Sequence, residues 1–263
     1  IKDNETVFAG VGIPTLGALL AKMTHAPNAI VAMEAGAIGP EAYRVALGIG
    51  DNACMENALS VTSLWRLFSD QQAGYFDIGM VGGAQVDKYG NLNSTAIFGD
   101  GDYENPAVRL PGSGGANDIA SSANRTLITM PLSRKRFLEN VDYITSPGYI
   151  DGQKREELEL KGNGPSVIIT NKCVFRFDEK TKEMYLASLH PGVDIEEIKE
   201  EVTWDLDIAD DLEVTPEPSE KELKMIRTLD SSRIYTGDGL DDITFDDYIK
   251  MLEDSLEELK ELD

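Results

Sequence analysis

The stretch that decides the fold spans residues 6–36 and reads TVFAGVGIPTLGALLAKMTHAPNAIVAMEAG. It begins with a short apolar run, turns at two glycines, continues with leucines at helical spacing, and returns to a second apolar run. A strand, a helix and a second strand in this order form the repeat unit of a parallel sheet. The second run ends at Glu34. A charge at the end of a buried strand is costly to desolvate unless a nearby group pairs with it or a function requires it.

The remainder of the chain continues the alternation of strands and helices. Short apolar runs at 75–81 and 126–130 predict further buried strands, and glycine-rich turns follow them. The pattern predicts an α/β fold, an open and mostly parallel layered sheet covered on both faces. Residues 166–177 and 184–189 are rich in β-branched and aromatic side chains and flank a polar turn, which predicts a hairpin. We therefore expect an antiparallel extension of the sheet.

Two further helices are expected, over residues 54–70 and 219–229. Residues 236–263 predict an acidic amphipathic helix that packs on its own domain or docks a partner. The predicted organisation is thus an α/β domain over 1–235, followed by a C-terminal helix over 236–263.

Composition excludes several classes of function. The 263 residues are 41% hydrophobic, which is enough for a sizeable core. The net charge of −23 argues against nucleic-acid binding, because phosphate contacts need clustered Lys and Arg. Much of the excess lies in residues 191–263, which hold 25 acidic and 7 basic side chains. No apolar run approaches the roughly 20 residues that span a bilayer, so we expect no membrane association.

Cysteine and histidine are scarce. Cys54 and Cys173 lie far apart, and His25 and His190 complete no metal-ligand spacing, so we expect no metal site. We expect both cysteines to be small buried residues and both histidines to be structural or surface residues. The polar, acidic residues 1–5 predict no secretory leader. The cysteine usage fits a reducing compartment, and we expect a cytoplasmic protein.

The common catalytic motifs are incomplete in this chain. Gly10 and Gly12 follow a strand, but Thr15 stands where a dinucleotide-binding fingerprint has its third glycine. No serine lies in a Gly-x-Ser-x-Gly context, and neither histidine has sequence support as a catalytic base. Carboxylate chemistry remains.

Glu34 and the glycine-rich residues 112–118, GSGGAND, are the two candidate halves of an acyl-transfer site. A glutamate can attack a carbonyl to give an anhydride, provided that donors face the oxygen that becomes negative. Backbone N–H groups of a glycine loop supply such donors. On the residues alone, a structural hydrogen bond or salt bridge is the commoner use of such a glutamate, and an ordinary surface loop explains the glycines.

A set of segments occurs in a recognisable order, namely residues 11–14 with Gly17, 33–36, 82–95, 112–117, 143–152 and 172–185. These segments resemble the beta subunits of the family I CoA-transferases, glutaconate CoA-transferase among them. The likeness runs in order over about residues 5–235 and favours the catalytic interpretation of Glu34.

The resemblance implies a mechanism. In that family the glutamate attacks an acyl-CoA thioester to give an acyl-glutamyl anhydride, and the released CoA thiolate then forms a glutamyl-CoA thioester. It implies a short acyl-CoA of the dicarboxylic type, such as glutaconyl-CoA, and a carboxylate acceptor. Coenzyme A enters as part of the substrate, and no permanently bound cofactor is expected. An alpha subunit is implied as the partner, in an α2β2 or larger assembly with the site at the subunit junction.

The resemblance also assigns the site residues. It makes Glu34 the nucleophile and gives backbone donors for the oxyanion to Gly114, Gly115 and Ala116. Substrate and CoA binding is expected from Gly36, Gly82, Gly83, Gln85, Asn91, Asn93, Gly112, Ser113 and Asn117.

Two alternatives share the fold. An acyl-CoA hydrolase or decarboxylase would use Glu34 as a general base and run without a carboxylate acceptor. A non-catalytic partner subunit would tolerate the loss of the Glu34 carboxylate.

Overall fold

The computed structural model describes residues 1–263 except 43, 154, 232, 238–243, 245, 247–248, 251–252, 254–256 and 258–263. The chain forms two compact units, Ile1–Leu67 with Pro218–Asp263 and Phe68–Glu217. Most of the C-terminal helix expected over 236–263 lies outside the described residues, and the expected division at residue 235 stays a prediction.

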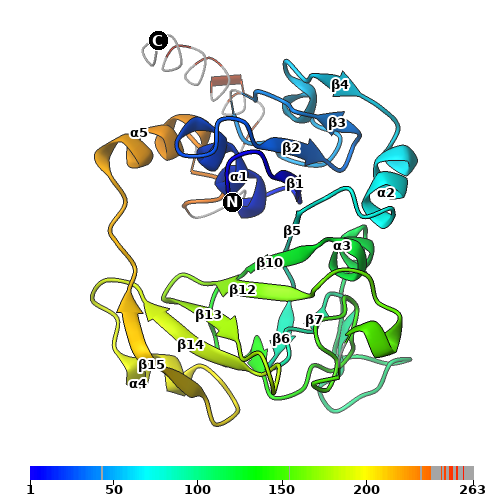
Figure 1. The fold of residues 1–263 in the computed structure, drawn as a ribbon, viewed down its shortest axis with the longest axis vertical. Helices are drawn as coiled ribbons and strands as arrows, with labels where there is room; N and C mark the ends of the chain where they lie inside the picture. Colours follow the sequence, from blue (N-terminus) through cyan, green and yellow to red (C-terminus); the bar gives the residue numbers. More distant parts are fainter. Residues whose placement is uncertain are drawn as a thin grey trace. The chain divides into compact units, whose positions relative to one another are not determined.

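The first unit is built from the strand–helix–strand stretch that opens the sequence (Figure 1). Strands β1 (Thr6–Ala9) and β2 (Ile30–Met33) pair in parallel, and helix α1 (Ile13–Met23) connects them. Strand β3 (Ala37–Ile38) pairs antiparallel with β2, and β4 (Ser60–Val61) pairs antiparallel with β3. The expected strands and helix of residues 6–33 are therefore confirmed.

Apolar packing fixes α1 in this unit. Pro14 lies in the first turn of the helix, where its missing N–H costs no hydrogen bond. Helix α5 (Glu220–Leu229) contacts α1, as expected for a helix over 219–229, and Ser219 and Glu222 form a capping box at its start. The buried cluster between these elements consists of Leu16, Leu19, Val45 and Leu229.

A three-residue loop joins β2 to β3. Met33 pairs with Ala37, which leaves residues 34–36 as the loop, and the Gly36 N–H donates to the Met33 carbonyl at 2.9 Å. Gly36 has φ +115°, in a region that favours glycine, and a Cβ there would overlap the Thr62 carbonyl oxygen. Glycine at position 36 is therefore a requirement of the hairpin.

The second unit carries parallel strands with an antiparallel extension. Strand β10 lies between β5 and β12 and pairs in parallel with both. Strand β13 pairs antiparallel with β12, and β14 pairs antiparallel with β13. Strand β15 pairs in parallel with β14. The α/β fold class and the expected hairpin are confirmed. The bounds of these strands are β5 Ile78–Val81, β10 Arg125–Thr129, β12 Pro165–Ile169, β13 Cys173–Phe177, β14 Met184–Leu189 and β15 Asp207–Val214.

Shorter elements complete this unit. Two small sheets contain β6 with β7 and β11, and β8 with β9. Their bounds are β6 Gln85–Asp87, β7 Leu92–Asn93, β8 Ala96–Ile97, β9 Val108–Arg109 and β11 Phe137–Leu138. The helices of this unit are α3 Ala116–Ser122, η2 Arg155–Leu158 and α4 Ile195–Glu200.

The helix expected over residues 54–70 is wrong in its first half. The chain there forms a short 3₁₀ turn, η1 (Asn52–Met55), and strand β4, and only then the helix α2 (Leu64–Gln72). Asn57 has φ +49°, a left-handed conformation that ends helical structure. Within the expected helix, Leu59 is exposed, whereas Leu67 is buried.

Replacing Gly36 by alanine should destabilise the first unit. The new Cβ would meet the Thr62 backbone at a φ that alanine rarely adopts, so we expect Gly36→Ala to lower the free energy of unfolding by at least about 2 kcal/mol. Chemical denaturation of both proteins measures the difference. Gly50→Ala is the matched control, because a Cβ at Gly50 meets nothing within 4 Å. Equal losses in both variants would contradict a specific requirement at position 36.

Candidate active site

Glu34 occupies the first position of the β2–β3 loop, directly after the carboxyl end of a parallel strand. Met33 before it is buried, whereas Glu34 itself is half-buried. The Thr62 N–H donates to the Gly36 carbonyl at 2.8 Å, which holds the far side of the loop. Ligand sites of open α/β sheets form at the carboxyl ends of their strands. The carboxylate therefore stands on a short, braced loop at the edge where such sites form.

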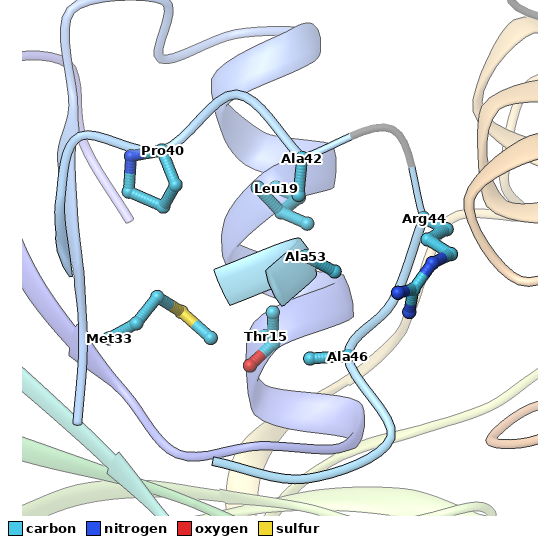
Figure 2. Close-up of a pocket in the computed structure, with 8 residues that line it drawn as sticks. All are labelled: Thr15, Leu19, Met33, Pro40, Ala42, Arg44, Ala46 and Ala53. Atoms are coloured by element: carbon cyan, nitrogen blue, oxygen red, sulfur yellow. The ribbon is translucent and has the colours of Figure 1, made fainter. Parts of the chain in front are cut away.

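A mostly aliphatic pocket lies beside this strand end, and Figure 2 shows Met33 of β2 and Thr15 of α1 lining it. Arg44 on its wall is buried and forms a two-point ion pair with Asp51, at 2.6 and 2.7 Å. Burial opposes the charge of Asp51, but the hydrogen bonds from Arg44 and from the Leu47 and Ala53 amides outweigh it and lower the pKa of this carboxyl to about 2. The ion pair thus fixes the segment from Arg44 to Asp51, whose Arg44 and Ala46 line the pocket together with Met33.

Both cysteines are buried, as expected, and both histidine rings contact hydrogen-bonding groups of the protein. Burial raises the pKa of the Cys54 and Cys173 thiols to about 11, so neither is a thiolate at neutral pH. The His25 ring contacts the Thr24 hydroxyl and the Ile1 carbonyl. The His190 ring bridges the Thr215 hydroxyl and the Thr170 carbonyl.

The glycine-rich loop lies in the second unit and leads into α3. Its first residue, Gly112, donates to the Ser94 carbonyl at 2.8 Å. Within the part of the chain that the structure describes, the N–H groups of Gly114 and Gly115 have no protein acceptor, whereas the Ala116 N–H donates to the Ser113 carbonyl at 2.9 Å. Two of the three expected backbone donors thus have no protein acceptor there, Gly114 being exposed and Gly115 buried.

The side chains of loop residues 113 and 117 differ in their surroundings. The Ser113 hydroxyl donates to the Gly114 carbonyl at 3.0 Å, so it is engaged within the loop. Asn117, in the first turn of α3, is exposed. No Cβ contact restricts Gly112 or Gly114, and their positive φ values of +98° and +51° account for the glycines.

Gln85 and Asn93 form the centre of a buried polar network. The Asn93 amide donates to Gln85 Oε1 at 2.6 Å and to the Ala96 carbonyl at 2.7 Å. Gln85 Nε2 donates to Asp142 at 3.2 Å, and Asn93 Oδ1 accepts from the Thr95 amide at 2.9 Å. Both side chains are at most 2% exposed, so their polar groups are used within the protein. They hold the segment at residues 94–95, to which Gly112 is bonded.

The glycine pair 82–83 adjoins the same network. The amide that follows it, Ala84 N–H, donates to the Asn93 carbonyl at 2.9 Å. A Cβ at Gly83 would lie 3.1 Å from Leu92, and one at Gly82 would lie 3.1 Å from the Thr129 carbonyl at the end of β10. The two glycines therefore allow the ends of β5 and β10 to approach the β6–β7 hairpin closely.

Asn91 secures the turn between β6 and β7 through Asp87. Asp87 accepts from the Tyr89 and Asn91 amides, both at 3.0 Å, and from Asn91 Nδ2 at 2.9 Å. Asn91 Oδ1 accepts in turn from the Gly148 amide at 2.8 Å. Burial outweighs these hydrogen bonds and raises the pKa of the Asp87 carboxyl to about 6.

Sequence reasoning missed Arg155, a buried cation in a cage of carbonyl groups. Its guanidinium donates to carbonyls of α3, of residues 147–148 and of residues 161–162. These include the Ala120 carbonyl at 2.8 Å and the Gly148 carbonyl at 2.6 Å. The surrounding sequence, KREELELK, is typical of a solvated surface and gave no signal. Arg155 therefore ties the end of α3, whose start carries the glycine loop, to the segment that Asn91 also holds.

The candidate residues thus form two groups. Glu34 and Gly36 lie on one hairpin loop of the first unit. The second unit brings together Gly82, Gly83, Gln85, Asn91, Asn93 and Gly112 through the contacts above, and the loop continues through Ser113, Gly114, Gly115, Ala116 and Asn117.

Two other kinds of feature are absent from the described residues. No group of three or more His, Cys, Asp and Glu side chains is placed there to hold a metal ion. None of the helices in those ranges combines the length and the apolar character needed to cross a bilayer.

The α/β fold, the glutamate at a strand end and the glycine-rich loops are features expected of an acyl-transferring enzyme. Comparison with known proteins gives the family. The family model described as Coenzyme A transferase matches residues 1–201, so the chain belongs to this family of enzymes. It is 38% identical over 233 residues to the B subunit of 3-oxoadipate CoA-transferase from Pseudomonas knackmussii, a match that covers 88% of both chains.

Glutaconate CoA-transferase of Acidaminococcus fermentans is similar in sequence and in structure. The B subunit of that enzyme is 39% identical over 235 residues, covering 86% of both chains. The crystal structure of the enzyme matches with a TM-score of 0.82 at 37% identity, over 90% of this chain and 93% of that one. The resemblance drawn from the sequence is therefore confirmed.

The buried Asp87 should give stability a recognisable pH dependence. Its pKa rises from 3.8 in the unfolded chain to about 6 in the fold, so folding favours the protonated form. This contribution is complete below pH 4 and is lost as the pH rises through about 6. We expect the free energy of unfolding to fall by roughly 3 kcal/mol over this window, and Asp87→Asn to remove that slope.

Denaturation at a series of pH values measures the slope. Asp178→Asn is the control, because the Thr181 and Lys180 amides lower the pKa of this exposed carboxyl. Its contribution is lost only as the pH falls below about 4, outside the window of Asp87. A slope between pH 4 and 6 that persists in Asp87→Asn would show that another group causes it.

Proposed function

We propose that this chain is the beta subunit of a CoA-transferase that moves CoA between a short dicarboxylic acyl-CoA and a carboxylate acceptor. The observation that carries the proposal is Glu34, a half-buried carboxylate on a three-residue loop at the carboxyl end of β2. Membership of the Coenzyme A transferase family supports it. The relatives named for 3-oxoadipate and glutaconate both act on dicarboxylates by their names, which supports the substrate class, glutaconyl-CoA included.

In the proposed reaction, the Glu34 carboxylate attacks the thioester carbonyl and the C–S bond breaks. The products of this step are an acyl-glutamyl anhydride and CoA thiolate. The thiolate then attacks the Glu34 carbonyl, releases the first carboxylate and leaves a glutamyl-CoA thioester. The acceptor carboxylate attacks that thioester to give a second anhydride, and the thiolate finally takes the acceptor's acyl group and frees Glu34. No electrons are gained or lost, and coenzyme A is a substrate rather than a resident cofactor.

The remaining residues have supporting roles in this proposal. The Gly114 and Gly115 amides donate to the oxygen that becomes negative when the thioester carbonyl is attacked, with Ala116 at the start of the helix behind them. Gly36, Gly82, Gly83, Gly112, Ser113 and Asn117 are proposed to bind substrate and CoA. Gln85, Asn91 and Asn93 act indirectly, by positioning these segments, because their polar groups bond to the protein.

The enzyme is proposed to work as a pair with an alpha subunit, doubled to α2β2 or larger, in the cytoplasm. Both relatives are named as B subunits, which supports a second kind of subunit. The Glu34 carboxylate would then be one part of a site that the alpha subunit completes.

Replacing Glu34 by glutamine tests the nucleophile in the reconstituted enzyme. The amide cannot attack the thioester, so we expect kcat to fall at least about 10³-fold while the subunits remain associated. Borohydride trapping in the presence of acyl-CoA should modify the wild-type chain at Glu34, as peptide mapping by mass spectrometry would show. Glu41→Gln, at an exposed position nearby in sequence, should leave kcat and trapping unchanged.

Three outcomes separate the alternatives. A trapped adduct on another residue, or full activity of Glu34→Gln, overturns the proposed nucleophile. If Glu34 is needed but no carboxylate acceptor is, release of CoA indicates a hydrolase and release of CO2 indicates a decarboxylase, each with Glu34 as general base. Transfer that continues in Glu34→Gln indicates a non-catalytic role for this chain.

A further inference from the structure

We infer that an exposed apolar surface beside the Glu34 loop is the place where the alpha subunit docks. This surface, the β4 patch, consists of Leu59, Val61, Leu64 and Trp65 in the first unit. The inference rests on the proposed function for the identity of the partner. It goes beyond that function in assigning the contact surface to particular residues.

The β4 patch is strongly exposed for side chains of this kind. Four exposed large apolar residues fall within seven consecutive positions, and clusters of exposed apolar side chains mark interaction sites. Tryptophan is moreover among the residues that contribute most to binding energy at interfaces. The exposed fractions are 77% for Leu59, 57% for Val61, 45% for Leu64 and 68% for Trp65.

The patch is built on a sheet edge with no protective charge. Strand β4 pairs with β3 on one side and, among the described residues, with no strand on the other. The segment from 57 to 65 contains no charged residue. Strand β15, the edge strand beside β14 in the second unit, instead carries Asp207, Asp210, Asp211 and Glu213. Charged side chains discourage strand pairing at an edge, so β15 is protected and β4 is left open to a partner.

Hydrogen bonds connect the patch directly to the Glu34 loop. Val61 pairs with Ala37, and the next residue, Thr62, donates to the Gly36 carbonyl at 2.8 Å. Gly36 closes the loop whose first residue is Glu34. A protein that covers Val61 and Trp65 therefore lies beside the loop that holds the carboxylate, where it can supply the other wall of the site.

Charge favours a different chain over a second copy as the occupant. Each copy carries a net charge of −23, so two copies repel one another on approach. Between residues 57 and 65, the patch contains no cation that would offset this repulsion. The fitting partner is an apolar and aromatic surface on the alpha subunit, which is the second kind of subunit in the proposed enzyme.

Single substitutions on the patch test the inference in the two-subunit complex. We expect Trp65→Ala and Leu59→Ser each to raise the dissociation constant for the alpha subunit at least about 30-fold, measured by analytical ultracentrifugation. Because both side chains are exposed, the melting temperature of the isolated chain should change little. Val214→Ser on β15 is the matched control, an exposed apolar residue on the protected edge, and should leave the constant unchanged.

Two results would overturn the inference. One is an unchanged dissociation constant in both patch variants. The other is self-association of this chain alone that the patch variants abolish, since the occupant would then be a second copy. Failure of the proposed chemistry is distinguishable, because it appears as missing borohydride trapping at Glu34 in wild-type complexes that assemble normally.

Discussion

The conformation of Gly36 is the constraint on which the candidate site depends. Its φ of +115° and the lack of space for a Cβ beside the Thr62 carbonyl allow a loop of three residues between β2 and β3. This loop fixes three things at once: the position of Glu34, the antiparallel pairing of β3, and the attachment of β4 through the bond from Thr62. The strand from which the loop projects is held by its pairing with β1 and β3, and Met33 at its end lines the same pocket as Arg44.

The second unit achieves comparable rigidity with polar groups. Asp87, Asn91 and Gln85 are buried, and their hydrogen bonds run to segments more than fifty residues away, as from Gln85 to Asp142. Arg155 adds a cation whose hydrogen bonds described above all go to backbone carbonyls. Fully bonded buried networks of this kind specify one arrangement, because any displacement leaves polar groups unpaired. The glycine loop thus belongs to a unit in which these hydrogen bonds join turns that are far apart in the sequence.

The sequence predicted those elements that form between residues close together in the chain. The strand–helix–strand of residues 6–33 and the β13–β14 hairpin follow from apolar periodicity and from a polar turn. The helix start at Ser219 is visible as a capping pair with Glu222. The helix expected from residue 54 fails because the left-handed Asn57 and the edge pairing of β4 override helical spacing.

Long-range contacts set the limit of prediction for the site. Glu34 and the glycine loop were proposed as site residues because their residue types are unusual and because the chain resembles a known family. The role of Arg155 could not be found, since its acceptors come from three separate segments and carry no side-chain signature. Gln85 and Asn93 show the same limit: the sequence identifies polar residues, but only the fold shows that their amides bond to the protein.

The shortness of the Glu34 loop also bears on how such enzymes can diversify. With Met33 paired to Ala37, one inserted or deleted residue would either break that pairing or reverse which face of β3 each side chain occupies. A change of length in this segment would therefore disturb the hairpin that carries Glu34. We expect changes in acyl preference to come from parts of the chain that can lengthen or shorten without moving the Glu34 carboxylate.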